Sequence, residues 1–295
     1  MSVRETCCVV ALAVGVGAVT CPQALMPPQL PVERAALPFE PPTLADAQGL
    51  FYNARYEEAV TLALALRSSG MQDLANDELR SSALLFQLKA LLEKRGDRKE
   101  VLKNCAVCPE LIADFMADIH HGQNLARTAL KADPRDEAAL FFLGKLDLNY
   151  VWLQLGPLGR KTGWDEYWEA RRSLETVLKH NPQHVRARVA RAWIDYIVDT
   201  KMPRGTRWVL GGGNRKQALV DVRQAAQIES DFFTRAEAEF ALWDMQVRER
   251  EMARAIDIAR KLADDFPDNR ELAAFLEARE ASSQGPPTPP GLSSK

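Results

Sequence analysis

Apolar residues recur at the three- and four-residue spacing of amphipathic helices along most of the chain, from Thr43 to Glu280. The first of these helices begins after Thr43, and residues 53–55 are expected to form the turn to a second helix. That second helix runs from Tyr56 to about Arg67 and ends at the Ser-Ser-Gly of residues 68–70. The pattern therefore predicts antiparallel helix pairs from the start of the fold.

The next segments follow the same pattern less regularly. Asp77 is expected to cap a helix that runs to Lys94, and the breaker residues 96–97 follow it. A loop up to Pro109 then leads into a long predicted helix from Glu110 to Ala132. These boundaries give a second helix pair with a long connection.

A fixed period runs through the second half of the chain. Predicted helices end at residues 131–134, 179–182 and 227–230, so that successive ends are 48 residues apart, and another helix ends at residues 264–267. A small residue lies twelve positions before each end, namely Gly122, Ala170, Ala218 and Ala255. The other helix of each pair carries Gly144, Ala192 and Phe240 at the same period. Such a period indicates stacked helix pairs that share one continuous core.

These positions resemble the tetratricopeptide repeat (TPR) family, and in part its exported bacterial members. Residues 53–59 (Asn-Ala-Arg-Tyr-Glu-Glu-Ala) resemble the turn and second-helix start of the repeat. The pattern also fits Ala139, Leu140, Leu143, Gly144, Ala170, Leu174, Val177, Pro182, Ala255, Ala259, Leu262 and Pro267. The resemblance implies an all-α, right-handed TPR-like helical-hairpin solenoid of about five helix pairs, with a capping helix near residues 270–281.

Two features depart from the family's pattern. The repeat has about 34 residues in the family, and two units here are longer, with extended intra-repeat loops at residues 155–164 and 202–214. Arg188 and Arg191 occupy positions where the family has core residues, so the groove of the middle repeat is expected to differ.

The two extended loops are the first candidate site. Thr162 with Asp165, and Asn214 with Gln217, have the spacing of capping boxes, so each loop is expected to end in a defined helix start. Both loops lie at the same place in adjacent repeats and are expected to project from one edge. That edge carries Arg160, Lys161, Trp164, Arg204, Arg207, Trp208, Arg215 and Lys216.

Two interpretations of this edge remain open. The main-chain N–H groups of residues 211–213 before a helix N-terminus, together with arginines, are typical of a docking edge for an acidic peptide or an anionic group. Alternatively, the tryptophans hold the loops down, the glycines permit a tight turn and the arginines are solvated. The glycines are not a phosphate loop, because no Lys-Ser/Thr follows them.

The TPR resemblance implies a second candidate site. In that family the first helix of each pair lines a concave groove, which here would include Lys145, Asn149, Arg186, Trp193, Glu237 and Asp244. Polar side chains among apolar neighbours fit a peptide-binding surface, and they also fit plain exposure to solvent.

Cys105 and Cys108 are a disulfide candidate, since two cysteines three apart pair readily in an exported protein. Redox catalysis is the weaker interpretation, because the strand–helix context of thioredoxin-like proteins is missing. A zinc site with His120 and His121 would need both rings on one ion, although adjacent helical residues point about 100° apart. No metal and no cofactor are therefore expected.

The two ends have compositions of their own. Residues 1–21 resemble an export signal, with an apolar run from Cys7 to Val19. Cleavage near residues 20–24, lipidation of Cys21, which would attach the chain to a membrane, and an uncleaved anchor are the alternatives. Residues 22–42 are expected to be a proline-rich tether, residues 43–282 the solenoid, and residues 283–295 a disordered tail.

Composition narrows the function classes. Leu, Ala, Glu and Arg dominate, which favours helix, and the net charge of -2 gives no field typical of nucleic-acid binders. No arrangement of nucleophile, base and carboxylate has a spacing that chemistry would require, so no catalytic residue is expected. We expect a non-enzymatic scaffold of the cell envelope, periplasmic or envelope-associated, that binds a protein or an acidic peptide. The alternative is a periplasmic small-ligand-binding TPR subunit associated with a transporter.

Overall fold

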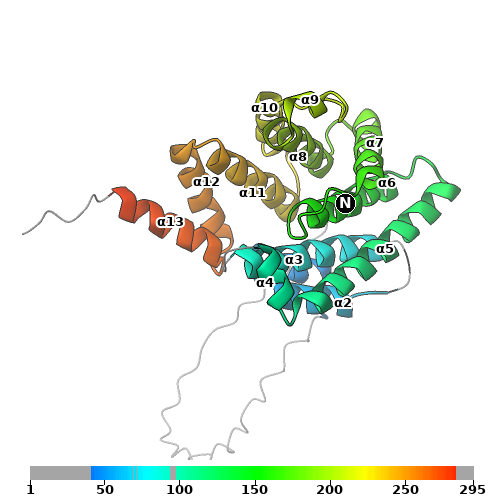
Figure 1. The fold of residues 1–295 in the computed structure, drawn as a ribbon, viewed down its shortest axis with the longest axis horizontal. Helices are drawn as coiled ribbons and strands as arrows, with labels where there is room; N and C mark the ends of the chain where they lie inside the picture. The colour runs from blue at the N-terminus through cyan, green and yellow to red at the C-terminus, as the bar shows by residue number, and fades with distance from the viewer. Residues whose placement is uncertain (1–40, 69, 71, 94–97, 284–295) are drawn as a thin grey trace, which may run out of the picture. The chain divides into compact units, whose positions relative to one another are not determined.

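The computed structural model describes residues 41–68, 70, 72–93 and 98–283. The expected export signal with Cys21, and nearly all of the expected tether and tail, lie outside these residues. Within them the chain is helical and contains no strand (Figure 1). No helix in this part is both long and apolar enough to cross a membrane.

Apart from two short helices described below, the described helices form five successive pairs and a final single helix. The pairs are α1 (Leu44–Tyr52) with α2 (Tyr56–Ala65), α3 (Asp73–Glu93) with α5 (Cys108–Ala132), α6 (Glu137–Leu155) with α7 (Trp164–His180), α8 (Val185–Lys201) with α10 (Arg215–Ala225), and α11 (Phe232–Arg248) with α12 (Met252–Asp265). Helix α13 (Arg270–Ser283) follows the last pair. The prediction of an all-α array of helical hairpins that ends in a further single helix is confirmed.

Small residues allow the paired helices to approach closely. Ala170, Ala218 and Ala255 are buried, as the register predicted. A Cβ added to Gly144 on α6 would lie 2.9 Å from Leu174 Cγ and 3.3 Å from the Ala170 carbonyl oxygen on α7. The glycine is therefore required by packing, since that position has no room for a side chain.

Two expected boundaries between residues 70 and 110 are wrong. Helix α3 begins at Asp73, whose carboxylate accepts a hydrogen bond from the Ser68 backbone N–H at 2.8 Å, and Asp77 lies inside the helix. Asp77 is buried and instead forms an ion pair with Arg67 and lies 2.7 Å from His121 Nδ1. The expected loop before Pro109 contains a short helix, α4 (Arg98–Asn104).

The starts of α7 and α10 differ in how they are capped. The side chain of Asn214 accepts a hydrogen bond from the Gln217 N–H at 3.0 Å and caps α10. This is one half of the expected capping box, because the Gln217 side chain donates to Asp221 instead. The capping box at Thr162 is wrong, because Gly163 is the N-cap of α7 and no side chain caps this helix. Gly163 has a φ of 92° and lies against Tyr150, a combination that requires glycine.

The first helix pair packs against the last helices of the array. The ring centroid of Tyr52 lies 5.3 Å from those of Phe240 and Phe266. Polar bonds surround this aromatic contact: Asn269 Nδ2 donates to the Tyr52 carbonyl oxygen at 2.6 Å, and Tyr56 Oη donates to Glu271 Oε1 at 3.1 Å. We call this set of interactions the closing contact, because it joins the two ends of the helix array.

Candidate functional site

Three of the six predicted groove residues contact one another in the middle of the array. Lys145 Nζ lies 2.7 Å from Glu237 Oε1 and 3.3 Å from Glu78 Oε1. Arg186 Nη2 lies 2.8 Å from Glu78 Oε2, and its Nε also binds Glu237. We call these four residues the central cluster; it joins α3, α6, α8 and α11 with two cations and two carboxylates.

Burial makes the pairing within the central cluster strong. Burial alone would raise the pKa of Glu237, but Arg186 and Lys145 lower it to about 2. Burial alone would lower the pKa of Lys145, but Glu237 and Glu78 raise it. These groups therefore remain charged and paired at neutral pH. A peptide could bind the cations of the cluster only by displacing its carboxylates, or the carboxylates only by displacing its cations.

The other predicted groove residues are also engaged within the chain. Asn149 is buried and donates to Ser81 Oγ at 2.9 Å and to Ser82 Oγ at 3.0 Å. Asp244 pairs with Arg248, whose guanidinium lies over the ring of the half-buried Trp193. With the closing contact in place, this face holds itself together by internal polar interactions.

The extended loops form a different kind of surface, which we call the insertion edge (residues 155–164 and 202–214). The second loop contains one helical turn, α9 (Arg204–Arg207), next to α8 (Figure 1). Its expected anion site has an internal ligand: Asp199 accepts from the Arg215 backbone N–H at 2.9 Å and from Arg207 Nη1 at 2.5 Å. Asp199 thus supplies the negative charge at the N-terminus of α10.

Hydrogen bonds from α7 also hold the glycine-rich part of this loop. Arg171 donates to the carbonyl oxygens of Leu210 at 3.0 Å and Gly211 at 3.1 Å. Tyr167 Oη also donates to the Leu210 carbonyl at 2.8 Å. The loop is therefore held by hydrogen bonds to α7 and to Asp199. Its exposed side chains are not needed for this and can contact a partner.

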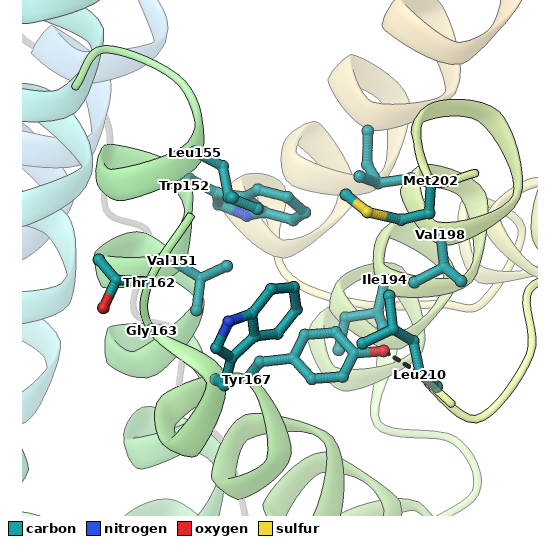
Figure 2. A pocket seen from close by; sticks show the side chains of 12 residues that line it. Val151, Trp152, Leu155, Thr162, Gly163, Tyr167, Ile194, Val198, Met202 and Leu210 are labelled. Carbon is teal, nitrogen blue, oxygen red and sulfur yellow. Dashed lines mark hydrogen bonds between the residues drawn. The ribbon is translucent and has the colours of Figure 1, made fainter. Parts of the chain in front are cut away.

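A small apolar hollow lies between the two loops and is lined mostly by residues of α6, α7 and α8. Figure 2 shows Trp152 and Tyr167 on one side, and Ile194, Met202 and Leu210 on the other. The free space is about 20 Å³, close to the room that one water molecule needs. A hollow of this size can receive at most the tip of one apolar side chain.

Exposed apolar side chains lie on the same edge. Trp208 is 77% exposed, Val209 is 52% exposed and Trp164 is 44% exposed, and they are among the few large apolar side chains that are exposed in the described residues. Arg160, Lys161 and Arg204 are exposed and form no ion pair with any described residue. Arg207, in contrast, is bound to Asp199 and to the Met202 carbonyl oxygen.

The cysteines and histidines lie apart from this edge. Cys105 and Cys108 are joined in a disulfide directly before and at the start of α5, with their Cα atoms 5.4 Å apart. His120 and His121 are exposed, and His121 Nδ1 lies 2.7 Å from Asp77 Oδ2. The described residues contain no group of His, Cys, Asp and Glu side chains that could hold a metal ion.

Sequence reasoning missed three residues that organise these regions. Glu78 and Tyr52 gave no signal, because their partners lie far away along the chain. Asp199 could have been noticed, since a carboxylate three residues before a loop of glycines and arginines is a candidate internal anion.

Comparisons with known proteins give one structural similarity. No protein-family model matches the chain, and no curated protein matches it. Among solved structures, the chain is similar to a thermophilic TPR protein of Thermus thermophilus, with 15% sequence identity and a TM-score of 0.44. The match covers 82% of this chain and 96% of that protein.

Proposed function

We propose that this TPR-like chain is a non-enzymatic interaction scaffold that binds a protein or peptide through the insertion edge. The observation that carries the proposal is the exposure of Trp208 and Val209 on a braced loop and of Trp164, which lines the apolar hollow. Tryptophan is highly buried on average in folded proteins, and it is enriched among binding hot spots. Because Asp199 and Arg171 already hold the loop in place, little conformational entropy would be lost on binding.

The insertion edge is a better candidate than the predicted groove. The central cluster satisfies its own charges, so a partner in the groove would have to break buried ion pairs, at a cost in binding free energy. The insertion edge requires no such exchange, because its exposed apolar area and its basic side chains face solvent.

We further propose that the bound segment is acidic and carries one apolar anchor. Arg160 and Lys161 on the first loop and Arg204 on the second lie, along the chain, within two residues of Thr162 or Met202, which line the apolar hollow. Unpaired basic side chains next to an apolar hollow complement carboxylates that flank an apolar residue.

The envelope is the proposed location, on the strength of the export-signal pattern in residues 1–21. Intact-mass analysis of the chain expressed in a bacterium tests this. Loss of about the first twenty residues supports export, and a further lipid mass on Cys21 supports membrane attachment. A full-length, unprocessed chain in the cytoplasmic fraction would refute the proposed location.

The small-ligand alternative has less support at this edge. Pockets for drug-sized ligands have roughly 300–1,000 Å³, whereas the hollow between the loops offers about 20 Å³. A side chain of a protein partner fits this space better than a whole small molecule does.

A peptide-display selection on the full-length protein tests the binding proposal. We expect selected peptides to combine acidic residues with an apolar anchor, and Trp208→Ser to weaken their binding by about tenfold or more, as for an aromatic hot spot. Lys161→Glu with Arg204→Glu should weaken binding and reduce its dependence on salt. Fluorescence anisotropy of a labelled selected peptide measures each effect.

Leu64→Ser is the matched control, because Leu64 is an exposed apolar residue on α2, outside both loops. It should leave peptide binding unchanged. If Trp208→Ser and Leu64→Ser bind the peptides equally well, the insertion edge is not the binding site. Arg207 is left unchanged, because its replacement would release Asp199 and alter the loop itself.

A further inference from the structure

A second hollow lies between α7, α8 and α10, away from the insertion edge. It is lined by Leu178, Pro182, Arg188, Arg191, Ala192 and Asp221, and its free space of about 280 Å³ is open to solvent. It shares no lining residue with the apolar hollow between the loops. Arg188 and Arg191 are also the two residues that depart from the repeat pattern, so the hollow coincides with a local change in sequence.

We call this space the α8 hollow. Some of the charged side chains around it have partners within the chain and others do not. Arg191 is neutralised by two carboxylates: it lies 3.1 Å from Glu175 Oε1 and 2.5 Å from Asp195 Oδ2. Asp221 accepts one hydrogen bond, from Gln217 Nε2 at 2.9 Å. Arg188 is partly exposed, and its guanidinium makes no hydrogen bond or ion pair with any described residue.

Arg188 and Asp221 thus line the same hollow with opposite charges but do not pair with each other. An arginine that lines a hollow without an ion-pair partner is available to the carboxylate of a ligand. A ligand that carries both a carboxylate and an ammonium group could satisfy both residues at once.

The rest of the lining selects the size and polarity of such a ligand. Leu178, Pro182 and Ala192 supply an apolar wall in the same hollow as Arg188 and Asp221. The volume lies just below the range of drug-sized ligand pockets, which limits the ligand to a small molecule.

From these observations we propose that the α8 hollow binds a free α-amino acid with an aliphatic side chain. The carboxylate of the ligand pairs with Arg188, its ammonium group with the free oxygen of Asp221, and its side chain packs on Leu178, Pro182 and Ala192. The net charge of Arg188 and Asp221 together is zero, as is that of the ligand, so binding leaves no charge uncompensated.

Calorimetric titration of the full-length protein with leucine, N-acetylleucine and leucinamide tests each half of the site. Leucine should bind more tightly than either derivative, because each derivative lacks one of its charges. Arg188→Gln should weaken leucine binding by about tenfold or more, as for a lost hydrogen bond to a charged group. Asp221→Asn should also weaken leucine binding, but it should strengthen that of N-acetylleucine by removing a carboxylate repulsion.

Arg223→Gln is the matched control, since Arg223 is an exposed arginine on α10 outside the hollow. It should bind leucine as the wild type does, and circular dichroism should show all variants folded. Equal binding of leucine by wild type and Arg188→Gln, or no leucine binding by folded wild type at millimolar concentration, would overturn the proposal. Trp208→Ser should not affect leucine, which separates this site from the insertion edge.

Discussion

Asp147 on α6 is a fully buried carboxyl whose environment opposes its charge. Gln123 Nε2 donates to its Oδ1 at 2.7 Å, but its buried Oδ2 has no hydrogen-bond partner among the described residues. Burial, and then the nearby carboxylate of Glu169, raise the pKa of Asp147 to about 8, although Gln123 and Arg127 act in the opposite direction. At the scale of the residue, this carboxyl lowers the stability of the folded state, and the packing of the surrounding core compensates for the loss.

The sign of its effect on stability follows from the direction of the shift. The unfolded chain releases this proton near pH 3.9, whereas the folded chain keeps it until about pH 8. Between these values the folded state binds more protons, so stability falls as the pH rises through this window. Asp147→Asn does not titrate and should therefore be more stable than the wild type by on the order of 4 kcal/mol at pH 7.

Chemical denaturation at several pH values measures this difference. The gap between Asp147→Asn and the wild type should be small near pH 4 and should widen up to about pH 8. Asp264→Asn is the control, because Asp264 is an exposed acid on α12 and should show no such trend. A gap that stays constant with pH would mean that Asp147 titrates normally in the folded protein.

At the scale of the helix pair, the sequence was a good guide wherever the constraint is local. The repeat period located Gly144, Ala170, Ala218 and Ala255, because each meets its neighbouring helix within one repeat. The period also placed the two extended loops correctly. It could not show that Asp199 would occupy the anion site of the second loop, or that Gly163 would replace Thr162 as a cap, because both depend on contacts between loops and helices.

Two glycines with opposite environments test the packing of the pairs. Gly144→Ala should destabilise the fold by about 1–3 kcal/mol, since its Cβ would lie 2.9 Å from Leu174 Cγ. Gly205→Ala on α9 should be neutral or stabilising by up to about 1 kcal/mol, because no atom lies within 4 Å of the added Cβ. Thermal melts of both variants compare them directly. If Gly144→Ala melts at or above the wild-type temperature, the close approach of α6 and α7 is not as tight as described.

At the scale of the whole described array, the closing contact changes what the repeats can do. A linear repeat array is stabilised only between neighbours, but here Asn53 Oδ1 accepts from the Asp268 backbone N–H, 215 residues away, at 3.0 Å. No periodic pattern encodes such a contact. For the same reason the groove residues Lys145, Arg186 and Glu237 were predicted as surface, and their fourth partner, Glu78, was missed.

The closing contact should couple the stability of the two ends, and Tyr52→Ala tests this coupling. Removing the ring deletes its contacts with Phe233, Phe240 and Phe266, which lie on α11 and directly after α12. Amide hydrogen exchange should therefore accelerate in α11–α13 as well as in α1 and α2.

Val60→Ala on α2 is the matched control, because Val60 packs towards α3 and not towards α13. Its effect on exchange should remain within the first two helix pairs. If Tyr52→Ala also affects only these pairs, the ends are energetically independent and the array behaves as an open solenoid whose groove is accessible. If the effect reaches α13, the closing contact keeps the central cluster inaccessible to a partner. A partner must then bind elsewhere on the surface, as it would at the insertion edge.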